Sequence, residues 1–376
     1  MTTLGYFESS PEMVEMVARS VDSGRLSYGP LSKEFEKRFA NMHGCAYGIF
    51  TNSGTSSLLA SLQELKEMHG WKDGEEVIVP YLKFVATVDL VYNCKLTPFL
   101  FDVDDMTYNI DPLLIESAIT PETVAIIPVH LFGLPCDADV IKNIADNYDL
   151  RIVEDSCECI LSEFSGKPVG SWGDVGCFST YVAHHLVTGV GGLCTTNNPD
   201  LNLYIRSIVN HGIDTRELPD GNNYDSSWLG RKFNFTSIGH SFRATELEAV
   251  IGLYQLDDLH HSIVKRRENA AYLSEKLTPM LAHYQLPVLS NEHSFMVYPI
   301  VLREGNASNI RSHLANMGVE SRSMVPLTNQ PCYDFNPNNY PVSKWLNQCG
   351  FYVRCHQGLV DRDLDKIANS IMEYFL

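Results

Sequence analysis

Between about residues 45 and 195, short apolar runs alternate with stretches of helical periodicity, and this alternation constrains the fold most strongly. The runs that predict strands are AYGIFT, EEVIVP, LTPFLFDVD, VAIIPVHL, LRIVEDS and GCFSTYVA. Apolar strands separated by helices are typical of a parallel sheet covered by helices on both faces. The sequence therefore predicts an α/β fold.

A second region follows this alternation. The pattern RATELEAVIGLYQLDDLHHSIVKRRENAAYLSEKL predicts one long helix, from about Arg243 to Leu277, that links two lobes. MVYPIVL and FYVRC then predict strands, and helices follow Asn306 and close the chain. We therefore predict a large α/β domain over residues 1–250 and a small α+β domain over 251–376, with the N-terminal segment packing on the small domain.

The charge of the chain argues against one broad class of partner. A formal net charge of −18 and a pI near 5.1 leave no broad basic surface for DNA, RNA or anionic lipid. The start of the chain lacks a basic segment followed by an apolar one, and no apolar run reaches the length of about 18 residues that a membrane helix needs. Ten scattered cysteines suit a reducing compartment. We expect a cytoplasmic protein without nucleic-acid or membrane partners.

The sequence does not indicate a metal site. Its His, Cys and carboxylate residues show no zinc-like spacing. Cys157 and Cys159 form the only close cysteine pair, and we interpret both as small buried residues.

Polar residues stand where the predicted strands end, and ligands of parallel sheets bind beyond those ends. In TNSGTSS, Thr51 to Ser57, small residues let backbone amides approach a phosphate at a helix N-terminus, although ordinary capping explains the same pattern. In RIVEDSCEC, Asp155 can hold a proton on a ring nitrogen or cap a helix. In VIVPYLKFVATVDLV, Phe84 can stack on a flat cofactor, whereas periodicity alone favours a core position. Lys83 beside it is interpreted as a lysine near a phosphate or at the surface.

In this order, the motifs resemble the sugar aminotransferases of the DegT/StrS family, which are fold-type I enzymes of pyridoxal phosphate. The resemblance runs from RLSYGPLSKEFEKRFA through TNSGTSSL, VIVPYLKFVAT, AIIPVHLFGLPCD, RIVEDSCE, GKPVGSWGDVGCFS and TGVGGL to FRATELEAVIGLYQL, SRSMVPLTNQP and GFYVRCHQGL. It implies an aspartate aminotransferase-like α/β fold with a large, mostly parallel sheet domain. It also implies a pyridoxal 5′-phosphate or pyridoxamine 5′-phosphate cofactor and a homodimer with active sites at the interface.

The resemblance implies a role for individual residues as well. Phe84 stacks on the pyridine ring, and Asp155 pairs with the ring nitrogen. Glu158 stands near the ring hydroxyl, where most relatives have Gln or His, and Ser241 stands where an Asn of the family reaches the neighbouring subunit's phosphate. The cofactor phosphate is held by Gly54, Thr55, Ser56 and Ser179.

The lysine of the family is absent from STYVAHHLVTGVGG, which instead carries His184 and His185 side by side. That lysine precedes the Gly of T-G-E-G-G by five residues, and counting back from Gly189 reaches His184. Imidazole can transfer protons but cannot form a stable Schiff base, so we expect the cofactor to bind noncovalently. The same substitution within a His-His pair is found in the sugar 3-dehydratase branch of the family.

That branch implies a reaction. Glutamate converts the cofactor to its pyridoxamine form, and the C3 hydroxyl group of a nucleotide-linked 4-keto-6-deoxy sugar is removed, with GDP-linked sugars favoured. His184 takes a proton and then protonates the departing hydroxyl group. No cysteine lies between Ile205 and Phe242, the region where the iron–sulfur members carry their cluster, so we expect none here. Such deoxysugars serve O-antigen or capsule polysaccharides.

Two alternatives stay open. Val190 replaces the usual Glu of the loop, so the enzyme could be an aminotransferase on another keto sugar, such as a heptose, with Lys83 in place of the missing lysine. The chain could instead bind cofactor or sugar without catalysis, although Asp155 and Ser179 argue against such decay. The candidates for substrate contacts or supporting roles are Lys83, His185, His211, Arg216, Arg322 and His356.

Overall fold

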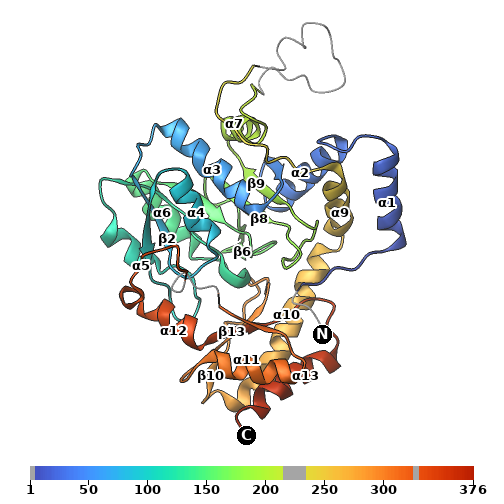
Figure 1. Cartoon of the computed structure of the whole chain (residues 1–376), viewed down its shortest axis with the longest axis vertical. Helices are drawn as coiled ribbons and strands as arrows, with labels where there is room; N and C mark the ends of the chain where they lie inside the picture. Colours follow the sequence, from blue (N-terminus) through green and yellow to red (C-terminus); the bar gives the residue numbers. More distant parts are fainter. Residues whose placement is uncertain (1–4, 215–233, 325–329) are drawn as a thin grey trace.

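The computed structural model describes residues 5–214, 234–324 and 330–376. Figure 1 shows a large lobe built around an extended sheet and a small lobe, coloured orange to red, below it. The large sheet has seven strands and the small one has four. Helix α10 (Leu259–Leu277) runs from the large lobe into the small one.

The large sheet has the strand order β1-β9-β8-β5-β4-β2-β3. Neighbouring strands pair in parallel except at β9, which is antiparallel to both β1 and β8. The predicted α/β fold with a mostly parallel sheet is therefore confirmed. The strands are β1 (Tyr47–Thr51), β2 (Glu76–Pro80), β3 (Thr97–Phe101), β4 (Thr123–Ile126), β5 (Arg151–Asp155), β8 (Val175–Ser179) and β9 (Gly192–Thr196).

Helices cover both faces of this sheet, which explains why its strands are apolar throughout. Val77 and Val79 of β2 join the hydrophobic cluster on the face of α3, α4 and α7, whereas Ile78 between them joins the cluster on the face of α6. Helices α2 and α9 pack on that second face. The helices are α2 (Pro30–Met42), α3 (Gly54–His69), α4 (Ala86–Asn93), α6 (Ala138–Tyr148), α7 (Pro199–Val209) and α9 (Glu246–Leu256).

The predicted single helix from Arg243 to Leu277 is wrong, because two helices occupy this stretch. Helix α9 begins with a capping box at Thr245, and a turn at Asp257 and Asp258 separates it from α10. Adjacent aspartates favour a helix end over a helix interior, since their side chains compete for backbone hydrogen bonds.

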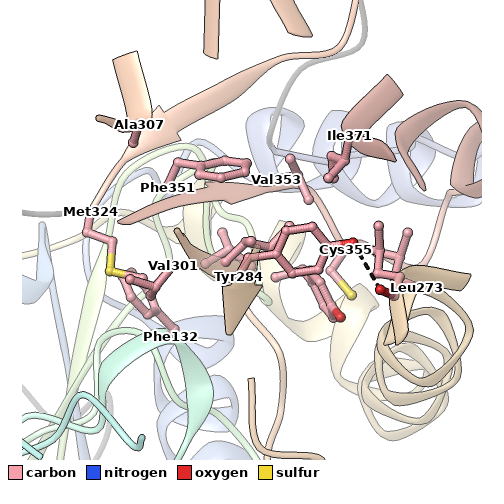
Figure 2. Close-up of a cluster of buried hydrophobic side chains, with 14 of the residues drawn as sticks. Phe132, Leu273, Tyr284, Val301, Ala307, Met324, Phe351, Val353, Cys355 and Ile371 are labelled. Carbon is pink, nitrogen blue, oxygen red and sulfur yellow. Dashed lines mark hydrogen bonds between the residues drawn. The ribbon is translucent and has the colours of Figure 1, made fainter. Parts of the chain in front are cut away.

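The small lobe has an antiparallel sheet of order β10-β11-β13-β12, packed against α10, α11 and α13. Figure 2 shows Phe351, Val353 and Cys355 projecting from β13 and its continuation into this core. The elements are β10 (Tyr284–Gln285), β11 (Tyr298–Leu302), α11 (Ala307–Asn316), β12 (Ser321–Ser323), α12 (Pro341–Cys349), β13 (Gly350–Val353) and α13 (Asp361–Glu373).

Shorter elements complete the chain. The N-terminal helix α1 lies against α9 at the edge of the large lobe (Figure 1). Across the described ranges, no helix combines the length and apolar character that a membrane span requires. The additional elements are α1 (Pro11–Asp22), α5 (Pro112–Ile115), β6 (Glu163–Phe164), β7 (Lys167–Pro168) and the 3-10 turns Glu116–Ala118, Leu131–Gly133, Thr278–Met280 and Pro337–Asn339.

Candidate active site

The parallel strands β1, β2, β5 and β8 end at the same edge of the large sheet, and most predicted site residues follow those ends. Helix α3 begins at Gly54 directly after β1, and Ser53 caps it by accepting a 3.1 Å hydrogen bond from the amide of Ser56. A Cβ atom on Gly54 would lie 2.8 Å from Ser179 Cβ and 2.8 Å from Cys157 Sγ. The structure thus brings Gly54 and Ser179 together, and Thr55 stands exposed beside them in the first turn.

Asp155 ends β5 with a buried side chain that is held in place by two donors. The Thr87 hydroxyl donates to Oδ2 at 2.8 Å, and the Cys157 amide donates to Oδ1 at 3.3 Å. Thr87 belongs to α4, so its hydroxyl group links the carboxylate at the end of β5 to that helix. Thr87 was not singled out in the sequence, although it lies inside the matched stretch VIVPYLKFVAT.

Phe84 and Lys83 are adjacent but differ completely in exposure. Phe84 is 58% exposed, so it is not a core residue as periodicity alone favours, and its ring is free to cover a ligand. Lys83 is buried and its Nζ donates to the Pro80 carbonyl at 2.5 Å, so it is not a surface lysine. Burial lowers the pKa of Lys83 well below its usual range, and the negative charge of Asp155 partly opposes that shift.

Glu158 lies next to the same edge and accepts a 2.9 Å hydrogen bond from the Phe132 amide. Burial raises the pKa of Glu158 to about 7, the nearby charge of Asp155 adds to the rise, and the hydrogen bond from Phe132 opposes it. A carboxyl group with this pKa is partly protonated at neutral pH, so it can donate as well as accept.

The two adjacent histidines of the loop between β8 and β9 have different environments. Nδ1 of His184 is buried and has no hydrogen-bond partner among the described residues, and burial lowers the pKa of His184 to about 4. Nε2 of His185 lies 3.3 Å from the Ser294 carbonyl oxygen, which ties the loop to the segment before β11. Burial also lowers the pKa of His185 well below its usual range, with the charge of Arg266 adding to the shift. Nδ1 of His185 is likewise buried without a partner among the described residues, so the two histidines differ in the contact that His185 Nε2 makes with Ser294.

Ser241 and His211 meet in an exposed cluster beside the end of β1. Arg243 joins them, because its Nη2 lies 2.7 Å from the Ser241 hydroxyl and 3.0 Å from His211 Nε2. The amide of Asn52 donates to the Phe242 carbonyl at 2.7 Å, so this segment runs next to the turn that begins α3. Arg243 was missed in the sequence, and its place in the matched motif FRATE is the signal that could have found it.

The small lobe supplies the other predicted positions. Arg322 in β12 is exposed and pairs with Glu320 at 3.1 Å, so its charge is already engaged. His356 is buried and stacks on Tyr6 with ring centroids 5.0 Å apart, and no described residue bonds to its Nδ1. Arg216 lies outside the described residues. In the part of the chain that the structure describes, no three His, Cys, Asp or Glu side chains gather as metal ligands would.

Comparison with known proteins gives one consistent family. The model of the DegT/DnrJ/EryC1/StrS aminotransferase family matches residues 8–372. A GDP-perosamine synthase of Caulobacter vibrioides is 32% identical over 352 residues, covering 92% of this chain and 90% of that protein. A GDP-4-keto-6-deoxy-D-mannose 3-dehydratase of Yersinia pseudotuberculosis is 31% identical over 373 residues, covering 94% of each chain.

A solved structure extends this likeness to three dimensions. The crystal structure of a GDP-4-keto-6-deoxymannose-3-dehydratase with a trapped PLP-glutamate geminal diamine matches this chain with a TM-score of 0.91 and 26% sequence identity. The match covers 99% of this chain and 100% of that chain. The aspartate aminotransferase-like fold expected from the sequence is thereby confirmed.

Proposed function

This chain belongs to the DegT/DnrJ/EryC1/StrS aminotransferase family, and on that premise we propose that it is a pyridoxal-phosphate enzyme that acts as a nucleotide-sugar 3-dehydratase. It removes the C3 hydroxyl group of a nucleotide-linked 4-keto-6-deoxy sugar, with GDP-linked sugars favoured, and it takes an amino group from glutamate. His184 carries this proposal, because it stands in the loop where the aminotransferases have lysine, with a buried Nδ1 that no described residue bonds to.

The residues at the edge of the sheet fit the cofactor. The N-terminus of α3 offers backbone amides to a phosphate, and the close approach at Gly54 brings the Ser179 hydroxyl to the same point. The buried carboxylate of Asp155 would keep the ring nitrogen protonated, and the exposed ring of Phe84 would cover one ring face. When bound, the cofactor supplies an electron sink conjugated to the reacting carbon of the sugar. Without a lysine link, it is held noncovalently.

His184 moves the proton in this proposal. Because burial lowers its pKa to about 4, the imidazole is neutral near pH 7 and can accept a proton. The protonated ring is then a stronger acid than an ordinary imidazolium, which favours passing the proton to the departing hydroxyl group. His185 supports it from the adjacent position, since its contact with the Ser294 carbonyl anchors the loop.

A nucleotide-sugar aminotransferase is the second candidate, favoured by the state of Lys83. Burial lowers the pKa of Lys83 well below its usual range, which favours the neutral amine, the nucleophilic form of lysine. Against this role, Nζ donates to the Pro80 carbonyl at 2.5 Å. In this alternative, Lys83 replaces the missing lysine, and the substrate is a different keto sugar, such as a heptose.

We also propose a homodimer with the active site at its interface. The exposed cluster of Ser241, His211 and Arg243 would then reach the cofactor phosphate of the neighbouring subunit. Sedimentation equilibrium gives the oligomeric state directly. A monomer with full activity would exclude this part of the proposal.

Product masses test the proposed reaction. The purified protein is incubated with pyridoxal phosphate, glutamate and GDP-, CDP-, UDP- or dTDP-linked 4-keto-6-deoxy sugars. A dehydratase releases ammonia and yields a sugar that has lost the C3 oxygen and kept its ketone. Replacement of the ketone oxygen by nitrogen would instead identify an aminotransferase.

Two variants separate the candidates. His184→Asn should bind the cofactor like the wild type and lose sugar turnover by at least about 100-fold, since general acid–base catalysis contributes that much. Lys83→Met should keep turnover if His184 is the base. Borohydride treatment should leave the protein mass unchanged, and a cofactor adduct at Lys83 would contradict noncovalent binding.

A further inference from the structure

His130 and Glu154 form a buried pair beside the carboxyl end of β5. Nε2 of His130 lies 3.1 Å from Oε2 of Glu154, and both side chains are buried. The Cys136 amide donates to Nδ1 of His130 at 3.0 Å, so the ring proton is on Nε2 and is donated to Glu154. The bond between the two side chains therefore has a fixed direction.

The carboxyl group of Glu154 also holds the segment that leads into β8. Its Oε2 accepts from the Gly170 amide at 2.8 Å, and its Oε1 accepts from the amides of Trp172 and Gly173 at 2.7 Å each. Because donors engage both oxygens, Glu154 serves as an anchor for the backbone around it. It ties the segment before β8 and the segment after β4 to the end of β5.

Glu154 and Asp155 project from opposite faces of the large sheet. Ile152 belongs to the hydrophobic cluster on the face of α6, and Val153 belongs to the cluster on the face of α3 and α4. Side chains alternate along a strand, so Glu154 shares the face of Ile152, and Asp155 shares the face of Val153. Thr87 of α4 binds Asp155 on that second face. The end of β5 is therefore held from both faces.

His130 directly precedes the turn Leu131–Gly133, which carries the hydrogen-bond donor of Glu158. The Phe132 amide in this turn donates to Oε2 of Glu158 at 2.9 Å. Phe132 has φ of +56°, a conformation that is costly for a residue with a side chain and persists only where contacts hold it. The amide of His130 donates to the Asp155 carbonyl at 3.1 Å. The backbone and the ring of His130 thus both tie the start of the turn to β5.

The other end of the turn is bound to the segment before β11. The Ser294 amide donates to the Gly133 carbonyl at 2.8 Å. The carbonyl oxygen of Ser294 in turn lies 3.3 Å from Nε2 of His185. The turn therefore connects Glu158 with the histidine loop, and His130 anchors this connection to the large sheet.

We propose that His130 and Glu154 are positioning residues of the cofactor site, which act through the turn Leu131–Gly133 to direct the carboxyl group of Glu158 toward the cofactor. This inference rests on the cofactor-binding part of the proposed function and not on the sugar reaction. Without the bond between His130 and Glu154, the turn loses an anchor and can relax from its costly conformation. Glu158 then loses the amide that stabilises its ionised form.

The groups around Glu158 make its protonation a measurable report on the turn. Burial raises the pKa of Glu158 to about 7, the charge of Asp155 adds to the rise, and the hydrogen bond from Phe132 opposes it. Three further titratable groups face Glu158, namely Tyr352, Cys157 and Cys159. Burial raises the pKa of each of these three far above 7, so they keep one protonation state near neutral pH.

The test follows the absorbance of pyridoxal phosphate bound to the full-length protein as pH is varied, because charges beside the ring tune its electronic state. The wild type should show a transition near pH 7 that Glu158→Gln removes. His130→Phe removes both hydrogen bonds of the ring and should raise the midpoint by about 0.5–1 pH unit, a change of about threefold to tenfold in proton affinity. The shift is limited because Asn109 also holds the turn, by accepting from the Leu131 amide at 2.9 Å.

Two further substitutions separate the two hydrogen bonds of the His130 ring. His130→Gln keeps a donor within reach of Glu154, whereas His130→Asn keeps only an acceptor for the Cys136 amide. The Gln variant should therefore keep the wild-type midpoint, and the Asn variant should shift like the Phe variant. His313→Phe is the control, since it removes the contact of another histidine with the Ser370 carbonyl at 3.0 Å, and it should lower the melting temperature without moving the midpoint.

Each outcome decides the inference. A raised midpoint in His130→Phe and His130→Asn, with the wild-type midpoint in His130→Gln, supports it. A lower melting temperature with an unchanged midpoint identifies a purely structural role and overturns it, and so does a transition that persists in Glu158→Gln. If His130→Phe does not fold, the comparison of His130→Asn with His130→Gln decides. If the midpoints shift as expected but the wild type converts none of the sugars, only the proposed sugar reaction fails.

Discussion

Substitution of Gly54 by alanine tests the proposed phosphate site most directly. The new Cβ atom would lie 2.8 Å from both Ser179 Cβ and Cys157 Sγ, whereas such atoms normally rest about 3.5–4 Å apart. The start of α3 or the end of β8 must therefore move by about 0.7–1.2 Å. That movement displaces a backbone amide or the Ser179 hydroxyl from a phosphate that both are proposed to bind.

The size of the effect follows from the bonds at risk. A hydrogen bond to a charged acceptor contributes about 1.5–3 kcal/mol, so losing one weakens cofactor binding by about tenfold to 100-fold. The fold itself should suffer less. Crowding costs about 1–3 kcal/mol, and replacing a helical glycine by alanine returns about 0.5–1 kcal/mol.

The assay titrates cofactor-free protein with pyridoxal phosphate and follows the absorbance of the bound form. Gly70→Ala at the other end of α3 is the control, since Gly70 has φ of +66° and no atom within 4 Å of the added Cβ. The control should lose about 1–2 kcal/mol of stability through backbone strain and keep its cofactor affinity. Wild-type affinity in Gly54→Ala would refute the phosphate site at this helix.

Three further outcomes are expected. The pKa of Glu158 in the folded protein is raised to about 7, so the free energy of unfolding of the wild type should fall as pH rises from about 4.5 to 7. The variant Glu158→Gln lacks this titrating group, so its loss of stability over the same range should be smaller by about 1–3 kcal/mol. Urea unfolding at pH 5 and pH 8 measures the difference. Arg206→Met leaves Glu36 buried without its 2.8 Å ion pair and should cost about 3–5 kcal/mol, so a loss below 1 kcal/mol in the same assay would contradict the pairing. Thr87→Val frees one oxygen of Asp155 and should slow turnover about tenfold without releasing the cofactor, which stopped-flow spectra can check.

Local sequence patterns predicted much of the fold. The alternation of apolar strands and helices predicted the mostly parallel sheet, because strands buried on both faces must be apolar at every position. It did not predict the break between α9 and α10, where two aspartates end a helix whose apolar period continues on both sides. Periodicity reports burial, and the buried residues Leu256 and Leu259 keep a helical spacing across the exposed turn between them.

Local sequence patterns predicted only some of the residues of the candidate site. The order of motifs pointed to Gly54, Asp155, Ser179 and His184, since each stands in a recognisable stretch after a strand. The exposure of Phe84 could not be read from periodicity. An aromatic residue after an apolar strand has the same pattern whether its ring enters the core or faces a ligand.

By itself, the sequence determined the family, the parallel sheet and the absence of a lysine from the histidine loop, because these depend on residue types at fixed spacing. The tertiary structure decided which groups are left unpaired. Thr87 reaches Asp155 across 68 positions of the chain, and among the described residues Nδ1 of the His184 side chain is buried without a hydrogen-bond partner. Such contacts depend on the packing of segments that lie far apart in the sequence. Local residue spacing therefore does not show which buried donors find an acceptor within the protein and which do not.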